Sequence, residues 1–219
     1  MTHASFAPRG SQRMTDRRPR WLQAFADRTE AFLPRAALSI VLALVAAQAA
    51  ILFAMGRVPM CTCGTIKLWQ GAIMSPETSQ QIFDWYTFSH LIHGFALYGL
   101  IWLLAPRASV ALRLVVAVVV ECGWEITENT DMIIDRYRAD TISLNYRGDS
   151  IINSVSDTLT MILGFGLAAW LPVRFVVAFA IVLEAVAGYA IRDNLTLNII
   201  MLIYPFEAIR AWQGGPLVH

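Results

Sequence analysis

The sequence has little charge and almost no lysine. Charged residues make up 15% of its 219 residues, and Lys67 is the single lysine among seventeen basic residues. A soluble domain usually carries about 25% charged residues. The net charge of +1 provides no basic surface of the kind that nucleic acid binds, so no nucleic acid partner is expected. Internal repeats and low-complexity tracts are also absent, which favours one domain.

Hydrophobic residues are abundant instead, at 57% of the chain with a mean hydropathy of +0.53. A membrane-spanning helix needs about 20 mostly apolar residues. Six segments of the chain are apolar. The last of them, residues 196–210, is short and contains Pro205, so it is either a sixth span or a half-helix. We predict an all-α, polytopic membrane helix bundle with five or six transmembrane helices. The apolar segments are residues 36–56, 86–105, 110–130, 151–171, 173–191 and 196–210.

The distribution of arginine predicts a cytoplasmic N-terminus. With that orientation, eleven basic residues lie on the inner side, Arg210 among them, and six on the outer side, as the positive-inside rule requires. Residues 1–35 are then a disordered or amphipathic cytoplasmic tail, 36–213 a single transmembrane domain, and 214–219 a C-terminal tail. Membrane lipids are the expected partners, and the bacterial inner (plasma) membrane is the expected location.

Several ionisable residues lie inside these apolar segments. His90 and His93, in SHLIHG, are one turn apart on one helix face. The next segment ends in ECGWEITEN, where three glutamates at spacings of four and three fall within about 40° of one another around the helix. They are Glu121, Glu125 and Glu128. The fourth segment opens with RGDSIINSVSD, in which three polar residues recur every four positions. They are Asp149, Asn153 and Asp157.

These buried charges predict a metal site near the outer surface. A charge at the centre of a spanning helix costs about 2.5–3.5 kcal/mol on insertion scales, so a compensating charge is needed. Carboxylates and imidazoles from three helices, without thiolate, suit Zn, Mn, Fe or Mg. Glu121 or Glu128 would act as general base on a metal-bound water. The predicted ligands are His90, His93, Glu125, Asp149 and Asp157.

Arginines of the outer loops would stand at the mouth of this site. Arginine is the usual bidentate partner of phosphate, which indicates an anionic headgroup. The predicted reaction is therefore metal-dependent hydrolysis or group transfer on a lipid or envelope component. Ion pairing with the loop residues Asp131, Asp135 and Asp140 is the alternative role of the arginines. The predicted substrate-binding residues are Arg138, Arg147, Arg192 and Asn153.

Other interpretations of the same residues stay open. The polar groups could form a structural network in a non-enzymatic scaffold or partner subunit, with the histidines hydrogen-bonded in the core. Asp84 and Asp149 could be helix N-caps. Cys61 and Cys63 could form a tight loop disulfide, serve thiol redox chemistry or bind metal. Glu184, near the middle of the fifth segment, could mark an ion or solute transport path.

Four blocks of the sequence resemble an uncharacterised family of bacterial inner-membrane proteins, known as a domain of unknown function. The resemblance covers most of the chain after residue 36 and implies a membrane location without an activity. The order of a His helix, a Glu helix and an Asp-x-x-x-Asn-x-x-x-Asp helix is also loosely similar to the vancomycin-teicoplanin resistance accessory membrane family. The blocks are residues 61–71, 84–99, 121–157 and 191–213.

Overall fold

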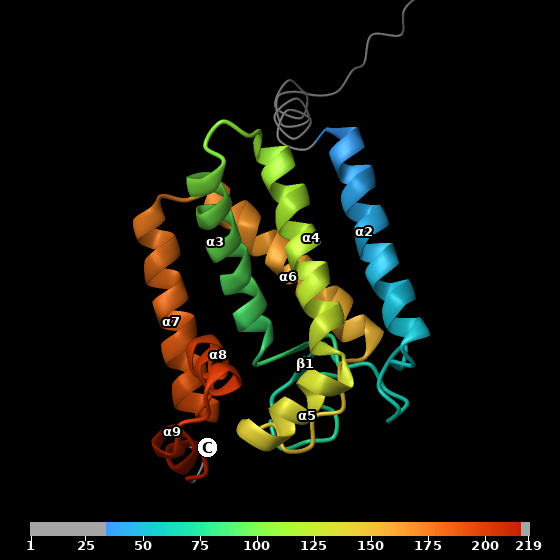
Figure 1. Ribbon diagram of the computed structural model, residues 1–219, viewed down its shortest axis with the longest axis vertical. Helices are drawn as coiled ribbons and strands as arrows, with labels where there is room; N and C mark the ends of the chain where they lie inside the picture. Colours follow the sequence, from blue (N-terminus) through green and yellow to red (C-terminus); the bar gives the residue numbers. More distant parts are fainter. Residues whose placement is uncertain (1–33, 216–219) are drawn as a thin grey trace, which may run out of the picture.

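Long helices lie side by side, and shorter elements gather at one end of the molecule (Figure 1). The computed structural model describes residues 34–215, so the predictions for 1–33 and 216–219 lie outside the described residues. The long helices are α2 (Arg35–Ala54), α3 (Thr87–Leu104), α4 (Val110–Glu128), α6 (Ile151–Trp170) and α7 (Val173–Ile191). The short elements are α5 (Asp131–Asp140), α8 (Leu195–Ile203), α9 (Glu207–Gln213), β1 (Trp69–Gln70) and β2 (Phe83–Asp84).

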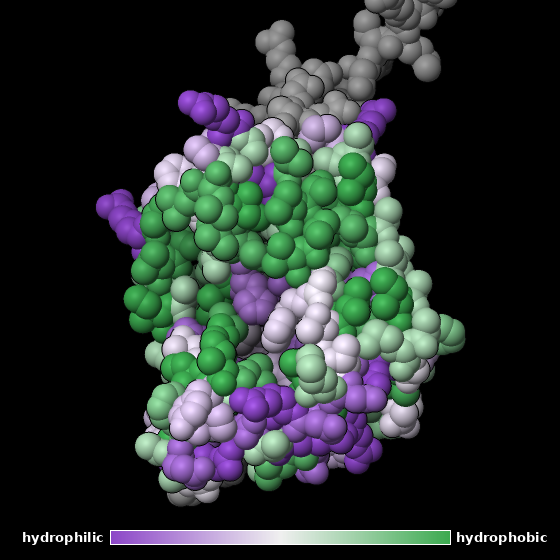
Figure 2. All heavy atoms as spheres, viewed as in Figure 1, coloured by the Kyte–Doolittle hydropathy of each residue, from purple (hydrophilic) through white to green (hydrophobic). Residues whose placement is uncertain are grey.

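Four of the long helices, α2, α3, α6 and α7, are long and apolar enough to cross a membrane, and they agree closely with the predicted segments. Their outward faces are apolar: Leu104 is 75% exposed and Val173 is 77% exposed. Figure 2 shows these residue types as a green band across the upper part of the molecule. Such a large apolar surface is expected where lipid rather than water is the solvent.

Helix α4 differs because it carries Arg113 and the three predicted glutamates. It nevertheless lies between α2 and α3 (Figure 1). Its buried side packs an apolar cluster against α2 and α6, with Leu114, Val118, Met161 and Phe165 at the centre. Arg113, Glu121 and Glu125 are buried as well, so these charged residues face the other helices rather than the outside of the bundle.

Helices α3 and α6 approach each other most closely at two glycines. A Cβ atom added to Gly94 would lie 2.5 Å from the Phe165 nitrogen, and one added to Gly164 would collide with the Leu91 carbonyl oxygen. Small residues at a helix crossing allow backbones to meet in this way. The crossing lies one turn beyond His90 on α3 and two turns beyond Asp157 on α6, so it sets the spacing of their side chains.

The last predicted segment is a half-helix. Helix α8 has nine residues, which span about 14 Å and cannot cross the hydrocarbon core. The chain turns before Pro205 and continues as α9, where Arg210 forms an ion pair with Asp140 of α5 at 3.0 Å. Arg210 therefore lies at the same end of the bundle as Asp140, whereas the sequence placed Arg210 on the inner side and the loop that contains Asp140 on the outer side, so these two placements cannot both be right.

Both predicted aspartate N-caps are also wrong. The α6 N-cap is Ser150, whose hydroxyl accepts a hydrogen bond from the Asn153 amide. At α3 the N-cap is Tyr86, and the buried Asp84 carboxylate instead accepts bonds from the Ser79 and Tyr86 amides, both at 2.8 Å. Burial raises the pKa of Asp84 above its usual value. In both places the aspartate fixes the connecting loop rather than the helix end.

Candidate metal centre

The two histidines of α3 share one carboxylate of α4. His90 Nδ1 lies 2.8 Å from Glu121 Oε1, and His93 Nδ1 lies 3.2 Å from both Glu121 oxygens. Their rings meet edge to face with centroids 5.1 Å apart. The one-turn spacing on α3 therefore brings both imidazoles to the same side of α4, as the sequence predicted.

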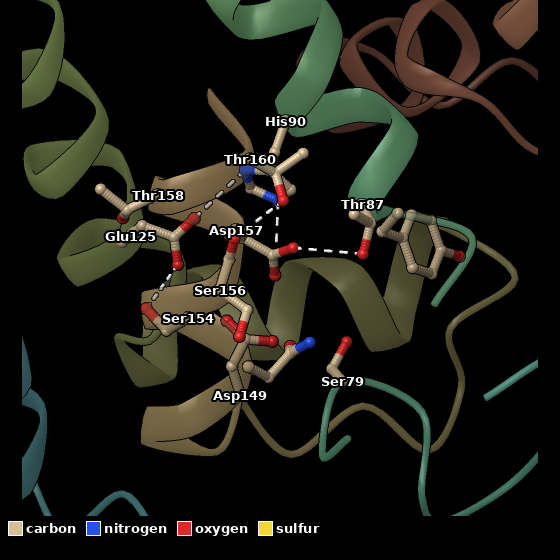
Figure 3. Close-up of polar contacts among 12 residues, drawn as sticks. Ser79, Thr87, His90, Glu125, Asp149, Ser154, Ser156, Asp157, Thr158 and Thr160 are labelled. Carbon is tan, nitrogen blue, oxygen red and sulfur yellow. Dashed lines mark hydrogen bonds and ion pairs between the residues drawn. The ribbon is translucent and has the colours of Figure 1, made fainter. Parts of the chain in front are cut away.

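Glu125 lies one turn further along α4 and is fully buried. Its Oε1 is 3.2 Å from His90 Nδ1, and its Oε2 accepts a 2.6 Å hydrogen bond from the Ser154 hydroxyl (Figure 3). Ser154 in turn accepts a bond from Gln48 of α2, whose side-chain oxygen accepts one from Thr158. A chain of hydrogen bonds therefore links Glu125 of α4 to α6 and α2.

Asp157 of α6 closes the cluster on the remaining side. Its Oδ2 lies 3.9 Å from His90 Nε2, and its Oδ1 accepts a hydrogen bond from the Thr87 hydroxyl at 3.3 Å. Figure 3 shows His90, Glu125 and Asp157 pointing towards one another from α3, α4 and α6. The structure thus brings three helices together at one polar centre.

Negative charge is in excess at this centre. Within the described residues, the ion pairs of Glu121, Glu125 and Asp157 are all to the two histidines, and none involves lysine or arginine. Three buried carboxylates therefore face at most two positive imidazoles. Since unpaired buried charges are costly, a bound cation would stabilise this arrangement.

The side chains present fit a divalent cation. Ligands bound at about 2.1 Å lie about 3.0 Å apart in an octahedron and about 3.4 Å apart in a tetrahedron. The contacts of His90 and His93 with Glu121, at 2.8 and 3.2 Å, match that spacing. In addition, the buried Glu125 Oε1 accepts no hydrogen bond within the described residues. At this centre, two ligand groups have all their donor atoms within 4.8 Å of one another: His90, His93 and Glu121, and His90, Glu125 and Glu128.

A cavity of about 170 Å³ adjoins these groups. His90, His93 and Glu128 form its polar wall, while Trp124 and residues of α8 form its apolar wall. Figure 2 shows hydrophilic atoms in the middle of the face that α3, α4 and α8 form, below the green band. The cavity has room for a few waters or a small chemical group beside the histidines.

The two predicted general bases occupy different positions. Glu121 contacts both histidines and belongs with the ligands, so a free role as base does not fit its contacts. Glu128 is half-buried and lines the cavity together with His90 and Tyr137. The geometry therefore favours Glu128 over Glu121 as the proton acceptor.

Asp149, a predicted ligand, lies outside both ligand groups. Its Oδ2 accepts a 2.7 Å bond from the Asn129 side chain, and its Oδ1 accepts one from the Tyr146 hydroxyl at 3.0 Å. Burial raises its pKa to about 6. Its contacts indicate that it anchors the loop before α6, although it lines a small cavity together with His90 and Asp157.

The arginines that were predicted to lie at the entrance of the site do not lie beside the histidines. Arg138 donates to the Tyr146 carbonyl oxygen at 2.5 Å and pairs with Asp135, which is the alternative role expected for it. Arg192 donates to the Trp212 carbonyl oxygen. Neither lines a cavity beside the histidines.

Two further predicted residues lie away from the histidines. The Asn153 side chain donates to the Gln81 carbonyl oxygen and is buried, so it serves the loop. Arg147 lines a separate cavity near the surface. The substrate-binding set is therefore not assembled around the cluster.

The structure also shows the roles of the two loop cysteines, of Glu184 and of Gln48. Cys61 and Cys63 form a disulfide, the simplest of the roles considered for them. The Glu184 carboxylate accepts bonds from the Leu195 and Thr196 amides, both at 3.0 Å, and so caps α8. Gln48 was missed, although after Arg35 at its start it is the one strongly polar residue of an otherwise apolar helix, and that isolation was the available signal.

The fold and the cluster define a class: a helical protein with membrane-length helices that enclose a buried His and carboxylate centre. The family described as "Protein of unknown function (DUF2585)" matches residues 52–215. The chain belongs to this family, as its resemblance predicted, whereas the looser similarity to the vancomycin-teicoplanin accessory family stays a prediction.

Curated relatives carry the same kind of description. A UPF0314 protein of Brucella anthropi is 55% identical over 176 residues, which cover 80% of this chain and 89% of the relative. A UPF0314 protein of Paracoccus denitrificans is 58% identical over 160 residues, which cover 73% and 83%. One from Rhizobium etli strain CFN 42 is 51% identical over 188 residues, covering 86% and 94%. No solved structure matches the chain.

Proposed function

We propose that the protein is a multi-pass protein of the bacterial inner membrane with five spans, α4 being the fifth. The position of α4 between α2 and α3, with Glu121 and Glu125 buried, supports this assignment. With the N-terminus in the cytoplasm and Arg210 counted on the outer side, ten basic residues lie on the inner side and seven on the outer side. The bias still follows the positive-inside rule.

We further propose that the cluster holds a divalent cation and catalyses hydrolysis or group transfer on a lipid or envelope component. The observation that carries this proposal is the convergence of His90, His93, Glu121 and Glu125, with a Glu125 Oε1 that accepts no hydrogen bond from the described part of the chain. A bound Zn, Mn, Fe or Mg would polarise a substrate oxygen and lower the pKa of water.

The residues of the chain have separable roles in such a reaction. Glu121 would hold both imidazoles in position, and the Ser154 hydroxyl would orient Glu125. Glu128 would accept a proton from water in the cavity, because it lines the cavity and lies within reach of His90. Glu121 therefore acts as a positioning residue or ligand, and Glu128 as the base.

The apolar wall of the cavity supports a lipid-like substrate. Leu195, Ile199 and Leu202 of α8 form it together with Trp124. A substrate with an apolar chain could contact this wall while its polar bond lies beside the histidines. Metal binding rather than arginine would then hold the polar part, since no lysine or arginine lines this cavity in the described part of the chain.

Metal analysis of the purified protein tests the site. We expect about one divalent metal ion per chain in the wild type and less than a tenth of that in His90→Ala and Glu125→Gln. Glu184→Gln is the matched control, an acid of another long helix that lies outside the cluster, and it should keep its metal. Equal metal content in all four folded proteins, or a wild type without metal, would refute the proposal.

Lipid turnover tests the reaction. Wild-type protein incubated with bacterial membrane lipids should change the mass spectrum of the extract, and a chelator should abolish the change. Glu128→Gln should keep the metal but lose activity by about 100-fold, which is typical for loss of a general base.

A non-enzymatic scaffold is the second candidate function. The hydrogen-bond chain from Glu125 through Ser154 to Gln48 favours it, because such a network also fixes helices. Full metal content with no lipid turnover would favour this scaffold.

A further inference from the structure

A second polar cavity, of about 240 Å³, lies among the loops at the end of the bundle where α2 ends and α6 begins. Its lining comes from three loop segments: 56–62, 76–80 and 145–149. Arg57 and Arg147 are the cationic residues of this lining. Because the lining is distinct from the cavity beside the histidines, this space needs its own explanation.

The Arg57 guanidinium is held in place but not fully paired. Its Nη1 donates to the Arg147 carbonyl oxygen at 2.7 Å, and its Nη2 lies 3.7 Å from Asp131, whose side chain is 93% exposed. Its Nε is buried and has no acceptor within the described residues. A positioned guanidinium with an unused buried donor is suited to receive an anion.

The second arginine is available as well. The Arg147 guanidinium forms no ion pair or hydrogen bond within residues 34–215, and the side chain is exposed at the cavity. Its neighbour Gly148 has φ +86°, and a Cβ there would lie 2.5 Å from Arg57 Nη1. The glycine therefore lets the 145–149 loop close onto Arg57, which brings both arginines to one cavity.

One acid also faces this cavity, and its charge is already engaged. Asp149 lines the cavity, but both of its oxygens accept hydrogen bonds from Asn129 and Tyr146. The other acid near Arg57 is Asp131, which is almost fully exposed and therefore well screened by solvent. The guanidinium donors of Arg57 and Arg147 are thus available to bind an anion from outside the chain.

The height of the cavity in the bundle indicates where that partner comes from. Arg57 follows the end of α2 by three residues, and Arg147 precedes the start of α6 by four. Both helices are long and apolar enough to span a membrane, so their ends lie at the level of lipid headgroups.

We infer that Arg57 and Arg147 form a binding site for a phosphate group, distinct from the metal centre. The phosphate belongs either to a lipid headgroup or to a soluble phosphorylated compound. Paired guanidinium groups recognise phosphate through bidentate, charge-assisted hydrogen bonds. The site stands without the proposed metal chemistry, since none of the proposed metal ligands supplies these donors.

Two binding measurements on the full chain test the site. Inorganic phosphate is titrated against detergent-purified protein by calorimetry, and retention of phosphatidic acid over phosphatidylcholine is measured in nanodiscs by mass spectrometry. Arg147→Gln is the principal variant because the Arg147 guanidinium makes no hydrogen bond or ion pair within residues 34–215, and Arg57→Gln is the second. Arg107→Gln, an exposed arginine of the loop between α3 and α4, is the matched control.

We expect Arg147→Gln and Arg57→Gln to weaken binding at least tenfold, about 1.4 kcal/mol, with Arg107→Gln unchanged. Loss confined to phosphatidic acid identifies a lipid headgroup, and loss of inorganic phosphate binding identifies a soluble ligand. Equal binding by all four proteins, or no binding of either ligand by the wild type, overturns the inference. Metal content measured in Arg147→Gln should equal the wild type, which separates this test from that of the metal centre.

Discussion

Replacement of Gly94 by alanine should separate α3 from α6 and disturb the polar centre. The added Cβ would lie 2.5 Å from the Phe165 nitrogen and 2.8 Å from the Gly164 carbonyl carbon. Ordinary contacts are about 3.4 Å or longer, so the backbones must move apart by roughly 1 Å. Overpacking of this kind costs about 1–3 kcal/mol, and a backbone contact cannot relax by a rotamer change.

The same shift has a local consequence. His90 precedes Gly94 by one turn, and Asp157 lies on the opposing helix. The contacts across this crossing, His90 to Asp157 at 3.9 Å and Thr87 to Asp157 at 3.3 Å, should lengthen beyond bonding distance. The contact of His90 with Glu121 on α4 should change less. We therefore expect the proposed metal site to bind its ion more weakly even where the helices remain folded.

Gly99→Ala is the matched control because it lies on the same helix with nothing within 4 Å of the added Cβ. Glycine to alanine in an unhindered helix stabilises by about 0.5–1 kcal/mol. Thermal unfolding in detergent should therefore show Gly94→Ala several degrees below the wild type and Gly99→Ala at or above it. Equal melting of the two variants would refute the close packing of α3 on α6.

Two further predictions concern the end of the bundle. Burial raises the pKa of Asp193 to about 6 from 3.8, so its contribution to stability is full below pH 4 and is lost as pH rises through 6. The loss in the free energy of unfolding amounts to about 3 kcal/mol. In Asp193→Asn, the free energy of unfolding measured between pH 4 and 8 should depend less on pH. The same pH dependence in variant and wild type would contradict this role of Asp193. Glu184→Ala removes the acceptor of the Leu195 and Thr196 amides, which should cost about 1–2 kcal/mol locally and speed hydrogen exchange in α8. Unchanged exchange there would show that this cap does not hold α8.

The helices of the bundle were predictable because their apolar runs are continuous. The predicted segment 173–191 coincides with α7, and 110–130 differs from α4 by two residues. Helix α5 was missed because its polar sequence lies inside a loop and has no apolar run to mark it. An ion pair between Arg136 and Asp140 at 3.0 Å spans one turn of this helix, a weak signal by itself.

The cluster was predictable for a similar reason. His90, His93, Glu121 and Glu125 sit on regular helices, so depth and periodicity determine where their short side chains meet. The hydrogen-bond partners of the arginines were not predictable. An arginine side chain is long and can reach several loop carbonyl oxygens and carboxylates, and only the folded structure determines which of them lie close. Arg138 takes a carbonyl oxygen eight residues away, and Arg192, with φ 56°, turns towards the C-terminal segment.

Gln48 gives α2 an orientation that its other residues do not. A helix that is apolar on all sides could rotate about its axis against α4 and α6 with little change in packing. The Gln48 amide is 1% exposed and bonds both Ser154 and Thr158, so one rotation satisfies it and every other rotation leaves an amide unsolvated in an apolar surrounding. One polar side chain thus specifies how α2 docks. With leucine in place of Gln48, α2 would still form, but its rotation about its own axis would no longer be fixed.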